Sequence, residues 1–161
     1  MRLWHFELIP YLPKKQLLSQ WRECILIAKN LAEKGTPNHI LVNKILDYSS
    51  ADFLIYGEKV MGEMRWRHYK ISDESTRKFY SYNKKWRNRR KEDLNGEMPK
   101  HYDCGPIFQN WHNDKYLIQC FENLKEKYDC GGISDEEFEI VRNFVIDYFD
   151  GTSIVALLEE V

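Results

Sequence analysis

Apolar residues recur at helical spacing in the first third of the chain, directly after two prolines at positions 10 and 13. The stripe is Leu17, Trp21, Cys24, Ala28 and Leu31. Residues three or four apart lie on one face of an α-helix, so this pattern predicts an amphipathic helix. A basic last turn followed by glycine at Lys34-Gly35 is a typical helix end. We therefore predict one helix over residues 14–34.

Three later stretches show the same periodicity. Residues 51–69 follow a serine that can cap a helix, Ser49 or Ser50, and residues 113–128 end at a pair of glycines. The sequence Ser134-x-x-Glu137 is a capping box, which opens another helix. The predicted inward stripes are Phe53, Tyr56, Val60 and Met64; Leu117, Cys120, Phe121, Leu124 and Tyr128; and Phe138, Val141, Val145 and Tyr148.

Residues 71–106 carry a less regular pattern, in which aromatic residues alternate with cations before Gly and Pro signals. We predict a short helix over about 76–91 followed by a loop, and a helical tail at 152–161. Together these elements predict an all-α fold, a compact single-domain bundle of about five helices over residues 1–161 with a basic, partly irregular middle segment.

Composition agrees with a globular chain, since 43% of the 161 residues are hydrophobic and can build a core. No run approaches the roughly 18 apolar residues of a membrane span. The opening has a single Arg and no long apolar segment, so we expect no leader peptide. The four cysteines form no C-x-x-C pair, which favours free thiols in a cytoplasmic protein. We expect a monomer that associates with the nucleoid.

The net charge of −1 conceals two oppositely charged segments. Residues 65–91 contain 11 Lys and Arg against two acids, a net of +9. Residues 133–161 contain eight acids against one Arg, a net of −7. This segregation suits a polyanionic partner that contacts one side of the molecule.

Most catalytic signatures are missing from the sequence. His101, Cys104, His112 and Cys120 lack the paired spacing of a zinc site, so we expect no metal. There is no Gly-rich phosphate loop and no G-x-S-x-G elbow. In residues 77–90 the aromatics could stack on bases while the cations neutralise phosphates. The alternative is a solvated charged segment whose aromatics pack on the core.

The opening residues offer a nucleophile. Arg2 is too large for the usual removal of Met1, so the chain is expected to begin with the Met1 α-amine. An α-amine is less basic than a lysine amine, so a useful fraction is neutral at cellular pH. It can form a Schiff base with an electrophilic sugar carbon, and a nearby carboxylate such as Glu23 could move the protons. The alternative role for Glu23 is an exposed helix carboxylate on the polar strip with Gln16, Ser19 and Gln20.

The motifs "MRLWH" at residues 1–5 and "LLSQWREC" at residues 17–24 resemble bacterial members of the pyrimidine dimer DNA glycosylase family. That family includes the phage endonuclease V. The resemblance continues more loosely through "HILVNKILDY", "YGEKVMGEMRWRHY" and "YLIQCFENLKEKY". It does not cover the basic segment or the acidic tail.

The resemblance implies specific roles. The family's nucleophile is the α-amine of its first mature residue, which corresponds to Met1, although the phage enzyme has threonine there. Its catalytic glutamate, with an arginine beside it, corresponds to Glu23 and Arg22. Family DNA contacts correspond to Arg2 and Lys127. Other family positions are occupied differently, by Asn123 and Leu26 in place of arginines and by Gln16 in place of a histidine, which suggests altered lesion recognition.

We therefore predict a base-excision DNA glycosylase with AP-lyase activity on pyrimidine dimers or related lesions. The partner is double-stranded damaged DNA, and no cofactor is required. The basic segment adds expected DNA contacts at Arg65, Arg67, Lys84, Lys85, Arg87, Arg89 and Arg90. Two alternatives stay open: a non-catalytic DNA-binding protein that retains the fold and basic face, and an interaction module whose acidic tail meets a basic partner.

Overall fold

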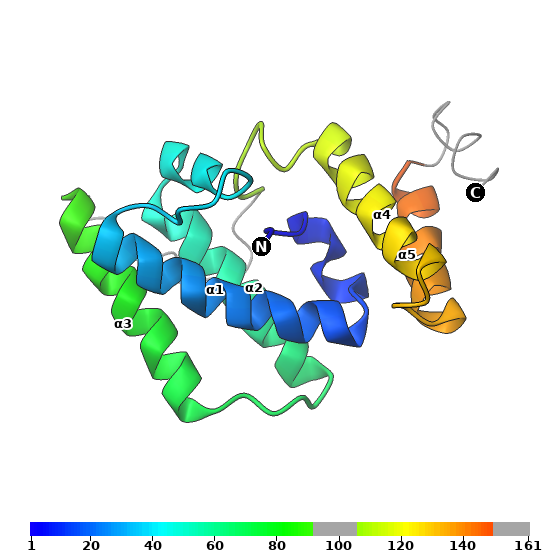
Figure 1. Cartoon of the computed structure of the whole chain (residues 1–161), viewed down its shortest axis with the longest axis horizontal. Coiled ribbons are helices and arrows are strands. Elements are labelled where there is room, and N and C mark those ends of the chain that lie inside the picture. Colours follow the sequence, from blue (N-terminus) through cyan, green and yellow to red (C-terminus); the bar gives the residue numbers. More distant parts are fainter. Residues whose placement is uncertain (92–105, 150–161) are drawn as a thin grey trace.

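The computed structural model describes residues 1–91 and 106–149, which form five α-helices and two 3-10 helices (Figure 1). No strand occurs within these described ranges, so the all-α prediction is confirmed. Of these helices, none is long and apolar enough to cross a membrane. In chain order the elements are η1 (Phe6–Tyr11), α1 (Lys14–Lys34), η2 (Asn43–Asp47), α2 (Ser50–Trp66), α3 (Asp73–Arg90), α4 (Asp114–Asp129) and α5 (Asp135–Tyr148).

Helix α1 has the predicted bounds, and every residue of its predicted apolar stripe is buried. It ends at Gly35, whose φ of 77° is left-handed. The Gly35 amide donates to the Leu31 carbonyl and so satisfies one of the last carbonyls of the helix. The glycine signal in the sequence therefore marked the end of the helix correctly.

Polar caps define the starts of the other helices. Ser49, Asn113 and Ser134 each accept a backbone N–H from the first turn of α2, α4 and α5, respectively. In the predicted capping box, the Glu137 carboxylate accepts the backbone N–H of Lys14 at 2.8 Å. That half of the motif therefore connects α5 to the free N–H groups at the start of α1.

Helix α3 begins three residues before its predicted start. Ser72 caps it by accepting the Ser75 amide, and Asp73 and Glu74 occupy its first turn. Acidic residues stabilise the positive end of the helix dipole, a start signal that the sequence prediction did not use. The loop predicted after α3 falls largely on residues 92–105, and the predicted helical tail falls on 152–161, so both lie outside the described residues.

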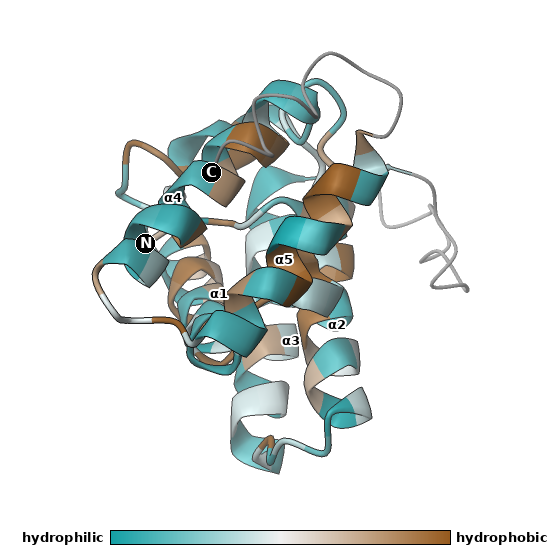
Figure 2. Cartoon of the chain, turned by 90° about the vertical axis from the view of Figure 1, so that its right-hand side faces the viewer, coloured by the Kyte–Doolittle hydropathy of each residue, from teal (hydrophilic) through white to brown (hydrophobic). Residues whose placement is uncertain are grey.

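The core surrounds α1, on which α2 and α3 both pack. Figure 1 places α3 on the left and α4 with α5 on the right, with the N-terminus between them. Hydrophobic and hydrophilic residues alternate along α5, which is typical of a helix with one buried face (Figure 2). Phe138, Val141 and Val145 are buried as predicted. The prediction for Tyr148 was wrong, because this last residue of the helix is 42% exposed and points past the edge of the core.

Candidate active site

The first five residues form an extended segment that leads through the core into η1. Leu3, Trp4 and His5 are buried, and Met1 packs against the hydrophobic core while remaining half-buried. Burial of three consecutive side chains holds the chain terminus in place. Trp4 and Trp21 are both in the core, as the sequence analysis predicted.

Two side chains of α1 hold the backbone of this segment from one side. The Arg2 amide donates to Glu23 Oε2 at 2.9 Å, and the Trp4 amide donates to Gln20 Oε1 at 3.1 Å. Gln20 and Glu23 are three residues apart and therefore neighbours on one helix face. The polar strip on α1 is thus the surface on which the N-terminal segment lies, and Glu23 is half-buried there.

Two tyrosines hold the same segment from the other side. Tyr116 donates its hydroxyl to the Leu3 carbonyl at 2.6 Å, and Tyr56 donates to the Trp4 carbonyl at 2.8 Å. Burial raises the pKa of both phenols above the usual value, so both remain protonated donors. The peptide groups Met1–Arg2, Leu3–Trp4 and Trp4–His5 are therefore oriented by side chains from α1, α2 and α4.

The Met1 α-amine is confined to the neighbourhood of Glu23 by covalent geometry. Three bonds separate its nitrogen from the Arg2 amide nitrogen, a separation of less than about 4 Å. Since that amide is hydrogen-bonded to Glu23, the α-amine lies within about 7 Å of the carboxylate.

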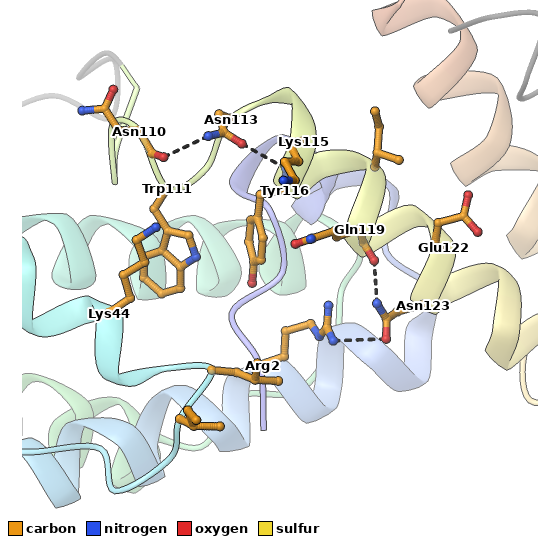
Figure 3. A pocket seen from close by; sticks show the side chains of 13 residues that line it. Arg2, Lys44, Asn110, Trp111, Asn113, Lys115, Tyr116, Gln119, Glu122 and Asn123 are labelled. Atoms are coloured by element: carbon orange, nitrogen blue, oxygen red, sulfur yellow. Dashed lines mark hydrogen bonds between the residues drawn. The ribbon is translucent and has the colours of Figure 1, made fainter.

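The Arg2 side chain points to α4. Its Nη2 donates to Asn123 Oδ1 at 3.1 Å, and its guanidinium carbon lies 5.4 Å from the centroid of the Trp4 ring. Asn123 is held in turn by its own donation to the Gln119 carbonyl at 2.5 Å (Figure 3). The Asn123 side-chain amide therefore orients Arg2.

A pocket of about 680 Å³ opens beside Arg2 (Figure 3). This volume falls within the usual range of ligand sites. Its wall combines two aromatic rings, four side-chain amides, three cations, one carboxylate and three apolar side chains. The lining residues are Arg2, Ile40, Leu41, Lys44, Asn110, Trp111, Asn113, Lys115, Tyr116, Ile118, Gln119, Glu122 and Asn123.

The remaining predicted residues near the terminus are solvent-accessible. Arg22 is exposed on α1 beside Glu23. Lys127 is exposed on α4, one turn beyond Asn123, and so shares a helix face with it. The structure thus brings Arg2 and Glu23 together at the terminus. Arg22 is the exposed neighbour of Glu23 on α1, and Lys127 lies on α4, the helix that the Arg2 side chain contacts.

The predicted DNA contacts in the basic segment divide into two groups. Arg65, Lys84 and Lys85 are exposed, and Arg87 is half-buried. Arg67 donates to the carbonyls of Pro10 and Leu12, both at 2.7 Å, and pairs with Glu63. Its guanidinium therefore connects the end of α2 to the turn between η1 and α1.

Arg89 and Arg90 also have contacts within the fold. Arg89 Nη1 donates to the Glu33 carbonyl in the last turn of α1, at 3.0 Å. Arg90 donates to the Leu46 carbonyl in η2 and lies over the Trp86 ring. Carbonyls at helix ends lack intrahelical partners, and cations there also interact favourably with the helix dipole.

The aromatics of the basic segment do not form an exposed stacking surface. Phe79 and Trp86 are buried and pack against Phe53. Of the two interpretations that the sequence left open, Phe79 and Trp86 therefore follow the one in which the aromatics pack on the core, because their spacing places them on the core side of α3. Tyr80 is exposed, and its hydroxyl donates to the Glu58 carboxylate.

Within residues 1–91 and 106–149, no group of three or more His, Cys, Asp and Glu side chains could hold a metal ion. His101 and Cys104 lie outside these described ranges. Burial raises the pKa of the Cys24 and Cys120 thiols, which disfavours the reactive thiolate.

Sequence reasoning missed several residues around the terminus. Gln20 was noted only as part of the polar strip, although its spacing to Glu23 could have indicated a paired role. Tyr56, Tyr116 and Lys115 reach the site from helices that are distant in sequence, and no local pattern marks them.

Comparison with known protein families gives an independent result. A family model described as pyrimidine dimer DNA glycosylase matches residues 1–88, more than half of the 161 residues. This range includes Met1, Arg2, Arg22 and Glu23, whereas α4 lies beyond it. No significant match was found among curated proteins or solved structures. The chain belongs to the pyrimidine dimer DNA glycosylase family.

Proposed function

We propose that the chain excises damaged bases and cleaves the resulting abasic strand, with the Met1 α-amine as the nucleophile. The observation that carries this proposal is the hydrogen bond from the Arg2 amide to Glu23, at the end of a segment that three further hydrogen bonds hold at Leu3 and Trp4. A nucleophile held in this way keeps the rate advantage of a fixed position.

The reaction begins when the neutral α-amine attacks C1′ of the damaged nucleotide. The bond from C1′ to the base breaks, and the base leaves with the bonding pair and takes up a proton. Loss of the amine proton and opening of the sugar ring at O4′ then give an imine that joins sugar to protein. Glu23 receives the amine proton and returns it to O4′, and its charge stabilises the cationic intermediate.

Strand cleavage follows from the imine. The cationic nitrogen acidifies the C2′ proton, and removal of this proton expels the 3′ phosphate oxygen by β-elimination. Water then hydrolyses the imine and frees the α-amine. All of these steps use groups of the chain, the substrate and water, and they require no cofactor.

DNA binding is supported by cations on two parts of the surface. Arg2, Arg22 and Lys127 are near the terminus, while Arg65, Lys84, Lys85 and Arg87 extend the positive charge along α2 and α3. Phosphate contacts of this kind position the duplex without reading its sequence. Arg67, Arg89 and Arg90 add charge to this field, although their guanidinium groups donate to backbone carbonyls within the fold. A distorted lesion lowers the cost of moving a nucleotide out of the stack, which favours damaged duplex as substrate.

Borohydride trapping tests this proposal. The protein is incubated with duplex DNA that carries a pyrimidine dimer or an abasic site, and the imine is reduced to a stable adduct. We expect an adduct with the parent protein, no adduct after acetylation of the α-amine, and much less adduct with Glu23→Gln. The matched control is Glu139→Gln, which neutralises an exposed carboxylate on α5 and is expected to leave trapping unchanged.

Two results would contradict the catalytic assignment. One is the absence of an adduct on both substrates together with salt-sensitive DNA binding, which favours a binding protein without catalysis. The other is an adduct that persists after the α-amine is blocked, which would show that a lysine side chain is the nucleophile.

A further inference from the structure

Two apolar side chains protrude into solvent beside the site. Ile40 is 87% exposed and Leu41 is 52% exposed, although Pro37 and Val42 on either side are buried. Exposed isoleucine and leucine forgo the stabilisation that burial would give. The packing of the described residues provides no reason for this exposure.

The turn that carries these side chains is braced by hydrogen bonds. Asn43 Oδ1 accepts the His39 amide at 3.1 Å and the Thr36 hydroxyl at 3.3 Å. The His39 carbonyl accepts the amides of Val42 and Asn43, both at 2.9 Å. Residues 36–43 are therefore a structured turn that presents Ile40 and Leu41 outward, and we call this segment the apolar turn.

The apolar turn lies at the mouth of the pocket beside Arg2, since Ile40 and Leu41 both line that pocket. Two exposed lysines, Lys44 of η2 and Lys115 of α4, line it as well. An apolar tip between cations is complementary to nucleic acid, in which stacked bases lie between rows of phosphates. The same arrangement fits an uncharged apolar protein surface poorly, because the lysines would lose their hydration there.

We propose that Ile40, supported by Leu41, is inserted between base pairs at the lesion and so opens the stack for the Met1 α-amine. Apolar wedges of this kind partly unstack a base step and kink the duplex. The nucleotide displaced by the wedge moves toward the pocket, where the half-buried Tyr116 ring lines the wall and the asparagines offer hydrogen bonds. This role rests on the proposed glycosylase function, because it supplies the step that precedes chemistry.

The test measures stack opening and chemistry separately. A 2-aminopurine placed next to a pyrimidine dimer becomes brighter when it is unstacked, and trapping with borohydride reports the chemical step. We expect Ile40→Ala to abolish most of the fluorescence increase. We also expect it to slow trapping on this duplex about tenfold or more, because unstacking costs a few kcal/mol and each 1.4 kcal/mol changes a rate about tenfold. On a single-stranded abasic oligonucleotide, which has no stack to open, trapping is expected to stay within about twofold of the parent.

Ile140→Ala is the matched control, because Ile140 is 55% exposed on α5 and does not line the pocket. It is expected to match the parent in both assays. The double variant Ile40→Ala/Leu41→Ala tests whether Leu41 substitutes for Ile40, and both positions are exposed enough for the fold to tolerate the change.

The wedge is overturned if Ile40→Ala and the double variant brighten 2-aminopurine as much as the parent does. It is also overturned if the variants slow trapping equally on the duplex and on the single strand, because the turn would then position the terminus. If the parent forms no adduct at all but still brightens 2-aminopurine in an Ile40-dependent way, the proposed catalysis fails and the wedge stands. A parent protein that leaves the fluorescence unchanged overturns the wedge, whatever the trapping result.

Discussion

Gln20 and Gln16 lie one turn apart on α1. They show that the contribution of a buried polar side chain to stability depends on whether it has a hydrogen-bond partner. The Gln20 side chain accepts the Trp4 amide, deep in the core. Gln16 Oε1 is buried without a partner among the described residues. A buried acceptor with a partner orients what it contacts, whereas one without a partner only costs desolvation.

We therefore expect opposite results from the same substitution. Gln20→Leu leaves the Trp4 amide unsatisfied and should lower the free energy of unfolding by about 1–3 kcal/mol. Gln16→Leu removes an unpartnered acceptor and should be neutral or stabilising. Urea denaturation of both variants measures the difference, and equal destabilisation of the two would show that the Trp4 contact has no special value.

His5 and His112 make the fold sensitive to acid. Their rings are buried with centroids 5.2 Å apart, and each Nδ1 accepts a backbone amide, that of Glu7 and Phe6, respectively. Burial lowers the pKa of His5 from 6.5 to about 4, and it lowers the pKa of His112 to about 2. Protonation of either ring would remove an acceptor from a backbone amide as well as bury a charge.

This pair predicts how stability depends on pH. Above pH 6.5 both rings are neutral in the folded and unfolded chains, and the full stability is present. Below that value the unfolded chain binds protons that the folded chain rejects, so stability falls as the pH drops toward about 4, by up to about 1.4 kcal/mol per pH unit for each histidine. His112→Asn keeps an acceptor oxygen near the Nδ1 position and should roughly halve this slope. A slope unchanged by His112→Asn would assign the acid sensitivity to the carboxylates.

At the scale of secondary-structure elements, the approach of α2 to α3 depends on a glycine. A Cβ at Gly57 would overlap the ring of Phe79, which is buried on the facing side of α3. Gly62, one and a half turns further along α2, is exposed and has no atom near its Cβ position. Gly57 is therefore packed against a neighbouring helix, whereas Gly62 on the same helix faces solvent.

Alanine substitution should separate the two glycines. Gly57→Ala is expected to destabilise the protein by about 1–3 kcal/mol through overpacking against Phe79. Gly62→Ala should stabilise it by roughly 0.5–1 kcal/mol, since alanine loses less backbone entropy in a helix interior. Thermal denaturation of the two variants and the parent measures these changes in stability. A Gly57→Ala variant as stable as the parent would mean that α3 can shift away from α2.

At the scale of the whole molecule, the charge segregation seen in the sequence maps only partly onto a DNA-binding face. Three arginines of the basic segment donate to carbonyls of η1, α1 and η2 and the adjoining turn. The exposed cations Lys84 and Lys85 stay on α3, on the opposite side of Figure 1 from α4. Whether the duplex reaches both sides determines the size of its footprint.

Salt dependence of binding measures that footprint. If both α3 lysines contact phosphates, the double variant Lys84→Ala/Lys85→Ala should lower the slope of log affinity against log salt by up to about 2. Trapping at saturating DNA should not change, because these exposed lysines are not among the residues that hold the terminus. A slope equal to that of the parent would restrict the footprint to the surface around Arg2, Arg22 and Lys127.

The amino-acid sequence alone determined the helices, since their signals are local. Apolar spacing and the Lys34-Gly35 end placed α1 at its observed bounds, and Ser49 and Ser134 marked two of the other starts. The opening residues suggested Met1 and Glu23 as candidate site residues, and the family resemblance added Arg2 and Arg22. The helix predictions succeed because periodicity and capping act within a few residues of chain.

Tertiary structure alone decided which polar groups meet. Arg2 contacts Asn123 across 121 residues, and Tyr116 holds Leu3 across 113. Arg67 was expected at the DNA, yet the free carbonyls of Pro10 and Leu12 lie beside it in the fold. Such pairings follow from how complete helices pack, and packing is a property of three-dimensional surfaces that no short stretch of sequence encodes.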